Sequence, residues 1–96
     1  MPLEPLLIVD DDPFVLGLLV HVAESRGLSV VGVASADDAD AAMSAGTFGA
    51  AIVDLQLGAD SGLDVIKRLR TYDPAIEAVV ISADRRLSSA IESIDL

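Results

Sequence analysis

The chain has 96 residues, with 16 acidic and 6 basic side chains, a formal net charge of −10 and no cysteine. This length predicts one small domain over residues 1–96, the charge argues against direct binding to nucleic acid or to an anionic membrane surface, and the lack of cysteine excludes disulfides and thiolate metal sites. The N-terminus lacks a signal-peptide pattern and no apolar run approaches the length of a membrane span, so we expect a cytoplasmic protein.

The first strand and helix are predicted from an apolar run and a helix start signal. Residues 6–9, Leu-Leu-Ile-Val, form a continuous apolar run of the kind found in buried parallel strands. Asp12 followed by Pro13 predicts an N-cap and the first residue of a helix that reaches Arg26, with Gly27 as its C-terminal stop. Six residues are expected on its buried apolar face: Phe14, Val15, Leu18, Leu19, Val22 and Ala23.

The middle of the chain predicts a second unit of the same kind and a third strand. Residues 28–34 read as the second strand. Ser35 with Asp38 three residues later resembles a capping box, and it opens an alanine-rich helix that ends at Gly46. Residues 48–54 then predict the third strand, which ends in an aspartate. The pattern of strand and helix continues without a linker or an internal repeat.

The last part of the chain predicts two further helices and a fourth strand. Ser61 caps a helix that carries Leu63, Ile66 and Leu69 on its apolar face and stops before Pro74. Residues 78–82 predict the fourth strand. A fourth helix is expected from Asp84 to the end of the chain because four apolar residues recur at helical spacing: Leu87, Ala90, Ile91 and Ile94. Four strand–helix units predict an α/β fold, a parallel sheet with helices on both faces.

Acidic residues follow two of the predicted buried strands. Asp10, Asp11 and Asp12 come directly after the first strand, and Asp54 closes the third. The carboxyl ends of parallel strands meet at one edge of an open sheet, so these acids should share a crevice. Like charges at such distances repel, and a divalent cation with oxygen ligands, Mg²⁺, would neutralise them. Asp12 can also be an N-cap alone, and the others can be ordinary loop acids.

Four features taken together resemble the receiver domain of two-component response regulators. They are the acid cluster in LLIVDDDP, the aspartate in AAIVDLQL, Gly62 eight residues after Asp54, and the hydroxyl in VVISAD. The resemblance covers essentially the whole chain. It implies a flavodoxin-like doubly wound parallel sheet, truncated to four strand–helix units, with strand order 2-1-3-4.

The resemblance also implies a function and a set of site residues. A histidine kinase or a phosphotransfer protein would transfer a phosphoryl group to Asp54, so the chain would be a signalling phosphoacceptor and not an enzyme in the usual sense. Ser82 and the backbone amide of Ala83 would bind the phosphoryl oxygens, although Ser82 can also be a plain hydroxyl at a strand end. Four groups would hold Mg²⁺: the carboxylates of Asp11 and Asp54, Asp10 through a bound water, and the backbone carbonyl of Gln56.

The sequence departs from the family pattern at two points. Gly58 stands four residues after Asp54, where receivers commonly have proline, and the chain ends at Leu96 before the fifth strand, with its lysine, and the fifth helix. Strand four is then expected to be an edge, so either the chain is part of a longer receiver or a homodimer forms through strand four or the last helix. The acids favour a phosphoacceptor, whereas the missing lysine favours a pseudo-receiver that serves only protein association.

Overall fold

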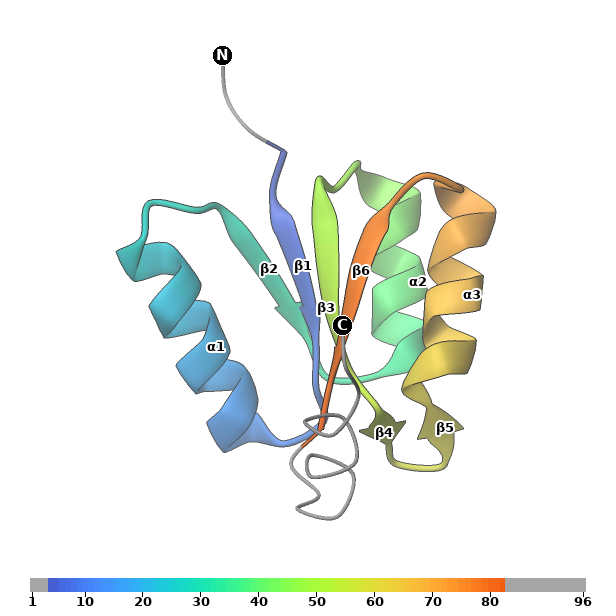
Figure 1. Cartoon of the computed structure of the whole chain (residues 1–96), viewed down its shortest axis with the longest axis horizontal. Coiled ribbons are helices and arrows are strands. Elements are labelled where there is room, and N and C mark those ends of the chain that lie inside the picture. Colours follow the sequence, from blue (N-terminus) through green and yellow to red (C-terminus); the bar gives the residue numbers. More distant parts are fainter. Residues whose placement is uncertain (1–3, 83–96) are drawn as a thin grey trace, which may run out of the picture.

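The computed structural model describes residues 4–82 (Figure 1). Its main sheet has four parallel strands: β1 (Leu6–Val9), β2 (Val30–Val33), β3 (Ala50–Asp54) and β6 (Glu77–Ile81). Their spatial order is β2-β1-β3-β6. Since β6 is the fourth strand of this sheet along the chain, the predicted doubly wound, flavodoxin-like order 2-1-3-4 is confirmed.

Strand β1 lies in the interior of the sheet, and Asp10, Asp11 and Asp12 directly follow it in the sequence. It pairs in parallel with both β2 and β3, with Val9 opposite Val33 on one side and Val53 on the other. The side chains of Leu7, Ile8 and Val9 are completely buried. This explains why the strand is a continuous apolar run, because a strand covered on both faces and both edges has no solvent side.

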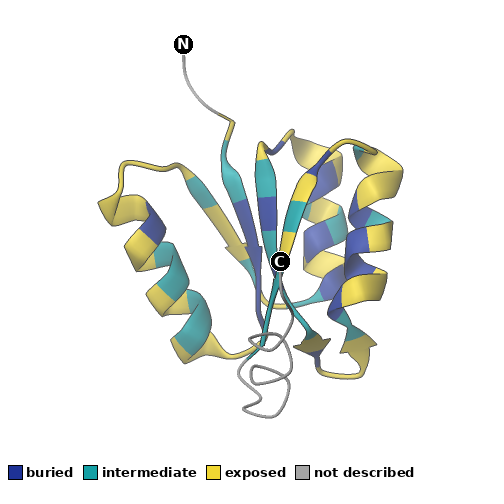
Figure 2. Ribbon diagram, viewed as in Figure 1, coloured by how far each residue is buried: buried dark blue, intermediate teal, exposed yellow. Residues whose placement is uncertain are grey.

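Helices cover both faces of the sheet, as predicted. Helix α1 (Pro13–Ser25) lies on one face, and α2 (Ala36–Ala45) and α3 (Gly62–Tyr72) lie side by side on the other (Figure 1). The main core fills the space between the sheet and the α2/α3 layer, where the dark blue residues gather in Figure 2. Its fully buried members include Leu7, Val9, Ala39, Ala51, Val53 and Leu69.

The predicted helix caps are present. The Oδ1 atom of Asp12 accepts hydrogen bonds from the backbone N–H groups of Phe14 and Val15, at 2.9 and 3.3 Å. The Oγ atoms of Ser35 and Ser61 accept backbone N–H groups in the first turns of α2 and α3 in the same way. Each such cap is worth about 1 kcal/mol of helix stability. The start of every described helix is therefore fixed by a residue that the sequence identifies.

The predicted apolar face of α1 is wrong for three of its six residues, which are exposed. Three of the six residues are buried or partly buried, namely Val15, Leu19 and Ala23, and three are exposed, namely Phe14, Leu18 and Val22. The buried face turns instead toward Leu16 and Val20, whose side chains lie 3.1 and 3.0 Å from the position of a Cβ atom on Gly32. Glycine in β2 lets the helix approach on that side, which rotates the buried stripe away from Phe14.

A second difference is a small antiparallel hairpin between β3 and α3, where only a loop was expected. Strand β4 (Gln56–Leu57) pairs with β5 (Asp60–Ser61). Gly58 has φ +58°, and it occupies the first central position of the turn, as glycine does in type II′ hairpins. The side chain of Leu57 is buried and ties the hairpin to the core.

The remaining differences concern the ends of elements. The second strand begins two residues later and ends one residue earlier than predicted, and the third strand begins two residues later. The fourth strand begins and ends one residue earlier than predicted. The predicted fourth helix lies outside the described residues. Between residues 4 and 82, no helix is both long enough and apolar enough to cross a membrane.

Candidate functional site

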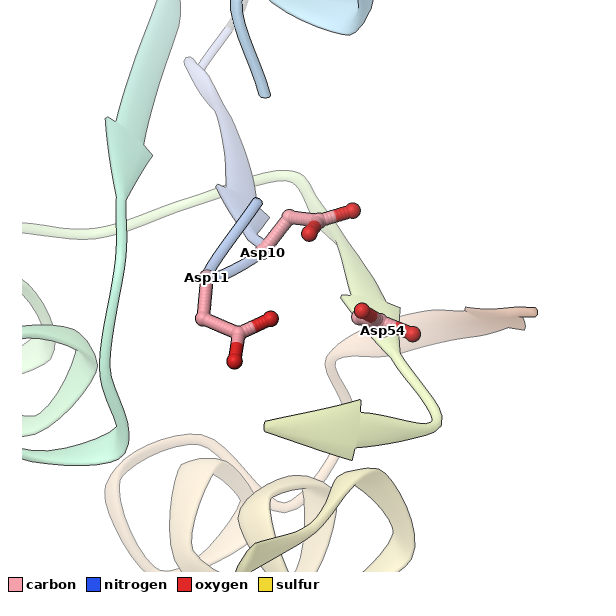
Figure 3. Close-up of side chains that lie close together, drawn as sticks. All are labelled: Asp10, Asp11 and Asp54. Atoms are coloured by element: carbon pink, nitrogen blue, oxygen red, sulfur yellow. The ribbon is translucent and has the colours of Figure 1, made fainter. Parts of the chain in front are cut away.

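The parallel pairing of β1 with β3 brings the acids together. Val9 and Val53 are register partners, so Asp10 and Asp54, the next residues of the two strands, leave the sheet at the same edge. One carboxylate oxygen from each of Asp10, Asp11 and Asp54 lies within 4.8 Å of the other two. Figure 3 shows the three side chains gathered at the ends of β1 and β3. The predicted meeting of these acids is therefore observed in the geometry.

Asp10 is the most deeply buried acid of the group, with 2% of its surface exposed. Its Oδ1 atom accepts the backbone N–H of Asp12 at 2.9 Å. Burial raises the pKa of the Asp10 carboxyl, the hydrogen bond from Asp12 lowers it, and the nearby carboxyl groups of Asp54 and Asp11 raise it further; the net direction is upward. A buried carboxylate in this position is costly unless a positive charge or a proton joins it.

The other two acids are held by backbone groups of the following loop and hairpin. The Oδ2 atom of Asp11, an exposed residue, accepts the backbone N–H of Gly58 at 3.0 Å. The Oδ1 atom of Asp54, which is partly buried, accepts the backbone N–H of Gln56 at 3.3 Å. The side chain of Gln56 donates in turn to the carbonyl of Gly58 at 2.9 Å. Both carboxyl groups are thus oriented by the segment between β3 and α3.

A cavity of about 260 Å³ opens beside the acids. Ser82, the predicted phosphoryl-binding hydroxyl, lies in its wall, and Ala83 is outside the described residues. Gln56 lies in β4, and its backbone N–H donates to Asp54. The predicted role of its backbone carbonyl as a metal ligand stays a prediction. The lining residues are Asp10, Asp11, Asp12, Val15, Asp54, Ile81 and Ser82.

Sequence reasoning did not assign three of the residues at this site. Val15 and Ile81 line the cavity because α1 begins, and β6 ends, at the edge where the acids lie. Gly58 contacts Asp11 through its backbone N–H, and a pattern of side chains cannot predict such a contact. The one available signal was the glycine itself, which stands where the resembled family commonly has proline.

The donor set fits a hard divalent cation. Three carboxylates offer oxygen atoms within one small volume, and Mg²⁺ is usually held by one or two carboxylates together with waters or phosphate oxygens. The burial of Asp10 and the repulsion within the group give a physical reason for a positive charge there. Asp11 is exposed and Asp54 is partly buried, while Asp10 lies deepest.

Comparison with known proteins agrees with this architecture. The family model "Response regulator receiver domain" matches residues 6–96. The chain is 34% identical over 89 residues to the alginate biosynthesis transcriptional regulatory protein AlgB of Pseudomonas syringae pv. tomato, covering 93% of this chain and 20% of that protein. It is 33% identical over 95 residues to the acid tolerance regulatory protein ActR of Sinorhizobium medicae, covering 99% of this chain and 49% of that protein. The chain thus spans between a fifth and a half of these two relatives.

Solved structures give the same result. A response regulator protein from Burkholderia pseudomallei, crystallised with a phosphorylated aspartic acid, a calcium ion and citrate, superposes with a TM-score of 0.79 at 30% identity, covering 93% of this chain and 52% of that one. A CheY-like receiver domain from Methylobacillus flagellatus gives 0.78 at 30% identity, covering 88% and 73%. Since the family model spans nearly the whole chain, and the strand order and acid cluster agree with it, this chain belongs to the family of response regulator receiver domains.

Proposed function

We propose that this receiver domain accepts a phosphoryl group on Asp54 from a histidine kinase or a phosphotransfer protein, with Mg²⁺ as cofactor. The observation that carries the proposal is the meeting of Asp10, Asp11 and Asp54 within 4.8 Å at the carboxyl edge of the sheet. Asp54 is the proposed nucleophile because it is the aspartate at the end of the third strand, which matches the phosphoacceptor of the resembled family, and it lies in the wall of the cavity. A donor group can therefore reach it from outside.

In the proposed transfer, an oxygen of the Asp54 carboxylate attacks the phosphorus of a phosphohistidine on the partner. The new O–P bond forms as the P–N bond to the imidazole breaks, and the released imidazole takes up a proton from water. Mg²⁺, when bound, neutralises the charges of the carboxylates and the phosphoryl oxygens. The chain acts here as an acceptor in signalling, and we do not assign it an enzymatic activity on other molecules.

Each residue of the site has a distinct part in this proposal. Asp11 and Asp54 would hold Mg²⁺ directly, Asp10 would act through a bound water, and the backbone carbonyl of Gln56 would complete the protein ligands. Ser82 lies in the cavity wall, and its hydroxyl is the proposed hydrogen-bond donor to a phosphoryl oxygen. The backbone amide of Ala83 is proposed for the same task. The hydrogen bond from Gln56 to Asp54 would orient the attacking carboxylate.

The partners we propose are proteins in the cytoplasm and a second copy of this chain. The net charge of −10 disfavours direct contact of this domain with nucleic acid, although the relatives AlgB and ActR are named as regulators and extend beyond the matched part. Strand β6 ends the described sheet at one edge, and Val79 on it is 58% exposed. Pairing of two copies through this edge would cover the backbone groups of β6 and the exposed side chain of Val79.

The function is tested by phosphorylation of the purified chain. Incubation with Mg²⁺ and acetyl phosphate should add the mass of one phosphoryl group, as read by intact mass spectrometry, and Asp54→Asn should remove the adduct. Asp64→Asn, at an exposed acid in α3 away from the cluster, is the matched control and should still be modified. If a folded chain gains no adduct from acetyl phosphate or from a phosphorylated donor protein, the pseudo-receiver that serves only association replaces this proposal.

A further inference from the structure

A long-range hydrogen bond joins Asp11 to the turn of the β4–β5 hairpin. The backbone N–H of Gly58 donates to Oδ2 of Asp11 at 3.0 Å, between residues 47 positions apart in the sequence. Asp11 is the exposed member of the three clustered acids, whereas Asp10 is buried and Asp54 is partly buried. Of the three carboxyl groups, that of Asp11 is thus the least confined by packing. The bond from Gly58 restricts a side chain that would otherwise turn freely in solvent.

The amide of Gly58 is itself held in position from both sides. Its carbonyl oxygen accepts the Gln56 side chain at 2.9 Å, and Leu57, the residue before it, is buried in the core. Its φ of +58° places the residue in the left-handed region, which glycine adopts without penalty. Leu57 and Asp60 pair across the turn and close the hairpin. The donor that meets Asp11 is therefore part of a fixed turn.

We propose that Gly58 is a positioning residue for the cation site, an inference that rests on the proposed function. Its amide fixes one oxygen of the Asp11 carboxylate so that the other is presented to Mg²⁺. A hydrogen bond to an ionised carboxylate is among the stronger ones, and partners that orient a metal ligand commonly change metal affinity by 10- to 100-fold when lost. Proline, common at this place in the resembled family, has no N–H and a φ near −65°, so it cannot make this bond.

Substitutions at the two left-handed glycines test the proposal. Gly58→Pro removes both the N–H and the left-handed conformation, and it should weaken Mg²⁺ binding by about 10-fold or more in calorimetric titration. Gly58→Asn keeps the N–H, and asparagine adopts positive φ more readily than most residues, so it should retain more affinity than Gly58→Pro. Gly27→Pro is the matched control, because Gly27 also has a positive φ, +82°, and donates its N–H to the carbonyl of Glu24. That control should lower the melting temperature and leave Mg²⁺ affinity unchanged.

A second measurement needs no metal and no change at Gly58. In metal-free protein, Asp11→Ala should speed hydrogen exchange of the Gly58 amide at least several-fold, while the amide of Gly62, which donates to the carbonyl of Leu55 at 2.6 Å, should keep its rate. Equal exchange of Gly58 in both proteins would overturn the positioning role, as would unchanged Mg²⁺ affinity in a folded Gly58→Pro. A wild-type chain that binds no Mg²⁺ but protects the Gly58 amide would refute the proposed cofactor while leaving the hydrogen bond established.

Discussion

The carbonyl oxygen of Asp54 lies 2.2 Å from the position that a Cβ atom would occupy on Gly62. The Cα atom of Leu55 is only 2.8 Å from the same position. Both neighbours are backbone atoms, so no side chain can turn aside to make room. The N-terminus of α3 therefore rests directly against the end of β3, and only glycine allows this approach.

Gly62→Ala should consequently destabilise the fold and move Asp54. We expect the free energy of unfolding to fall by about 1 to 3 kcal/mol or more, because the added methyl group must displace backbone. Urea denaturation measures this loss. Gly17→Ala, in the exposed middle of α1 where a Cβ meets nothing within 4 Å, is the control and should gain about 0.5 to 1 kcal/mol. Equal effects at the two glycines would show that the close approach at Gly62 is not tight.

Mg²⁺ should raise the melting temperature of the chain, because a cation that binds the folded acid cluster stabilises it by mass action. At a concentration ten times the dissociation constant the gain is about 1.4 kcal/mol. Asp11→Asn should remove most of this gain, whereas Asp38→Asn, at an exposed acid in α2, should keep it. Differential scanning fluorimetry with Mg²⁺ or EDTA makes the measurement. A wild-type melting temperature that does not respond to millimolar Mg²⁺ argues against the site.

The raised pKa of Asp10 predicts a pH effect in metal-free buffer. Because its pKa is higher in the folded than in the unfolded state, Asp10 contributes stability below its unfolded pKa and loses that contribution as pH rises through its folded pKa. Asp10→Asn cannot ionise, so its stability relative to wild type should increase over the same rise in pH. Urea denaturation in EDTA at several pH values tests this, and a difference that does not change with pH would contradict it.

Arg68 of α3 connects the two helices that cover one face of the sheet. Its guanidinium donates hydrogen bonds to the carboxylates of Asp37 and Asp40 in α2. Since the group is in contact with solvent, Arg68→Ala should cause only a small loss of stability, and the loss should shrink at high salt. Arg68→Lys should recover part of it, because an ammonium group lacks the planar fork of donors. Denaturation at 0.05 and 1 M NaCl, as rough bounds of the screening range, separates these effects.

Self-association predicts about twice the chain mass in light scattering at micromolar concentration. A charge on the exposed side of the edge strand, Val79→Glu, should dissociate the dimer without harming the core, since Val79 is 58% exposed. A charge at the neighbouring Val80 would be a poorer choice, because Val80 packs against the core. Asp38→Lys, at an exposed acid in α2, serves as the charge-change control and should leave the mass unchanged. A wild-type chain that is a stable monomer at these concentrations would end the proposal.

The sequence contained enough information for the sheet and for the meeting of the acids. Apolar runs that end in Asp10 and Asp54 predict parallel strands with their acids at one edge, and the caps Asp12 and Ser61 show where helices begin. These signals are local, and the fold agrees with them. The residue types alone are therefore sufficient to predict the layers of the fold and the edge of the sheet at which the acids meet.

The parts that were missed depend on contacts between distant segments. Helical periodicity places Phe14 and Val15 on neighbouring positions, and only the packing of α1 beside Gly32 decides which of them is buried. The β4–β5 hairpin has strands of two residues each, too short for any alternation to be visible. The link between Asp11 and Gly58 passes through a backbone amide, which every residue except proline carries. The expected fourth helix, outside the described residues, stays a prediction.

The interior position of β1 also limits the order in which the strands of the sheet can pair during folding. Its two neighbours are residues 30–33 and 50–53, which follow it at a distance in the chain, so neither edge of β1 can pair before those segments are available. Such non-local pairing slows folding. Asp10 and Asp54 become neighbours only when the register of β1 with β3 is set. The acid cluster therefore forms together with the core, and a chain in which β1 and β3 have not yet paired lacks the proposed site.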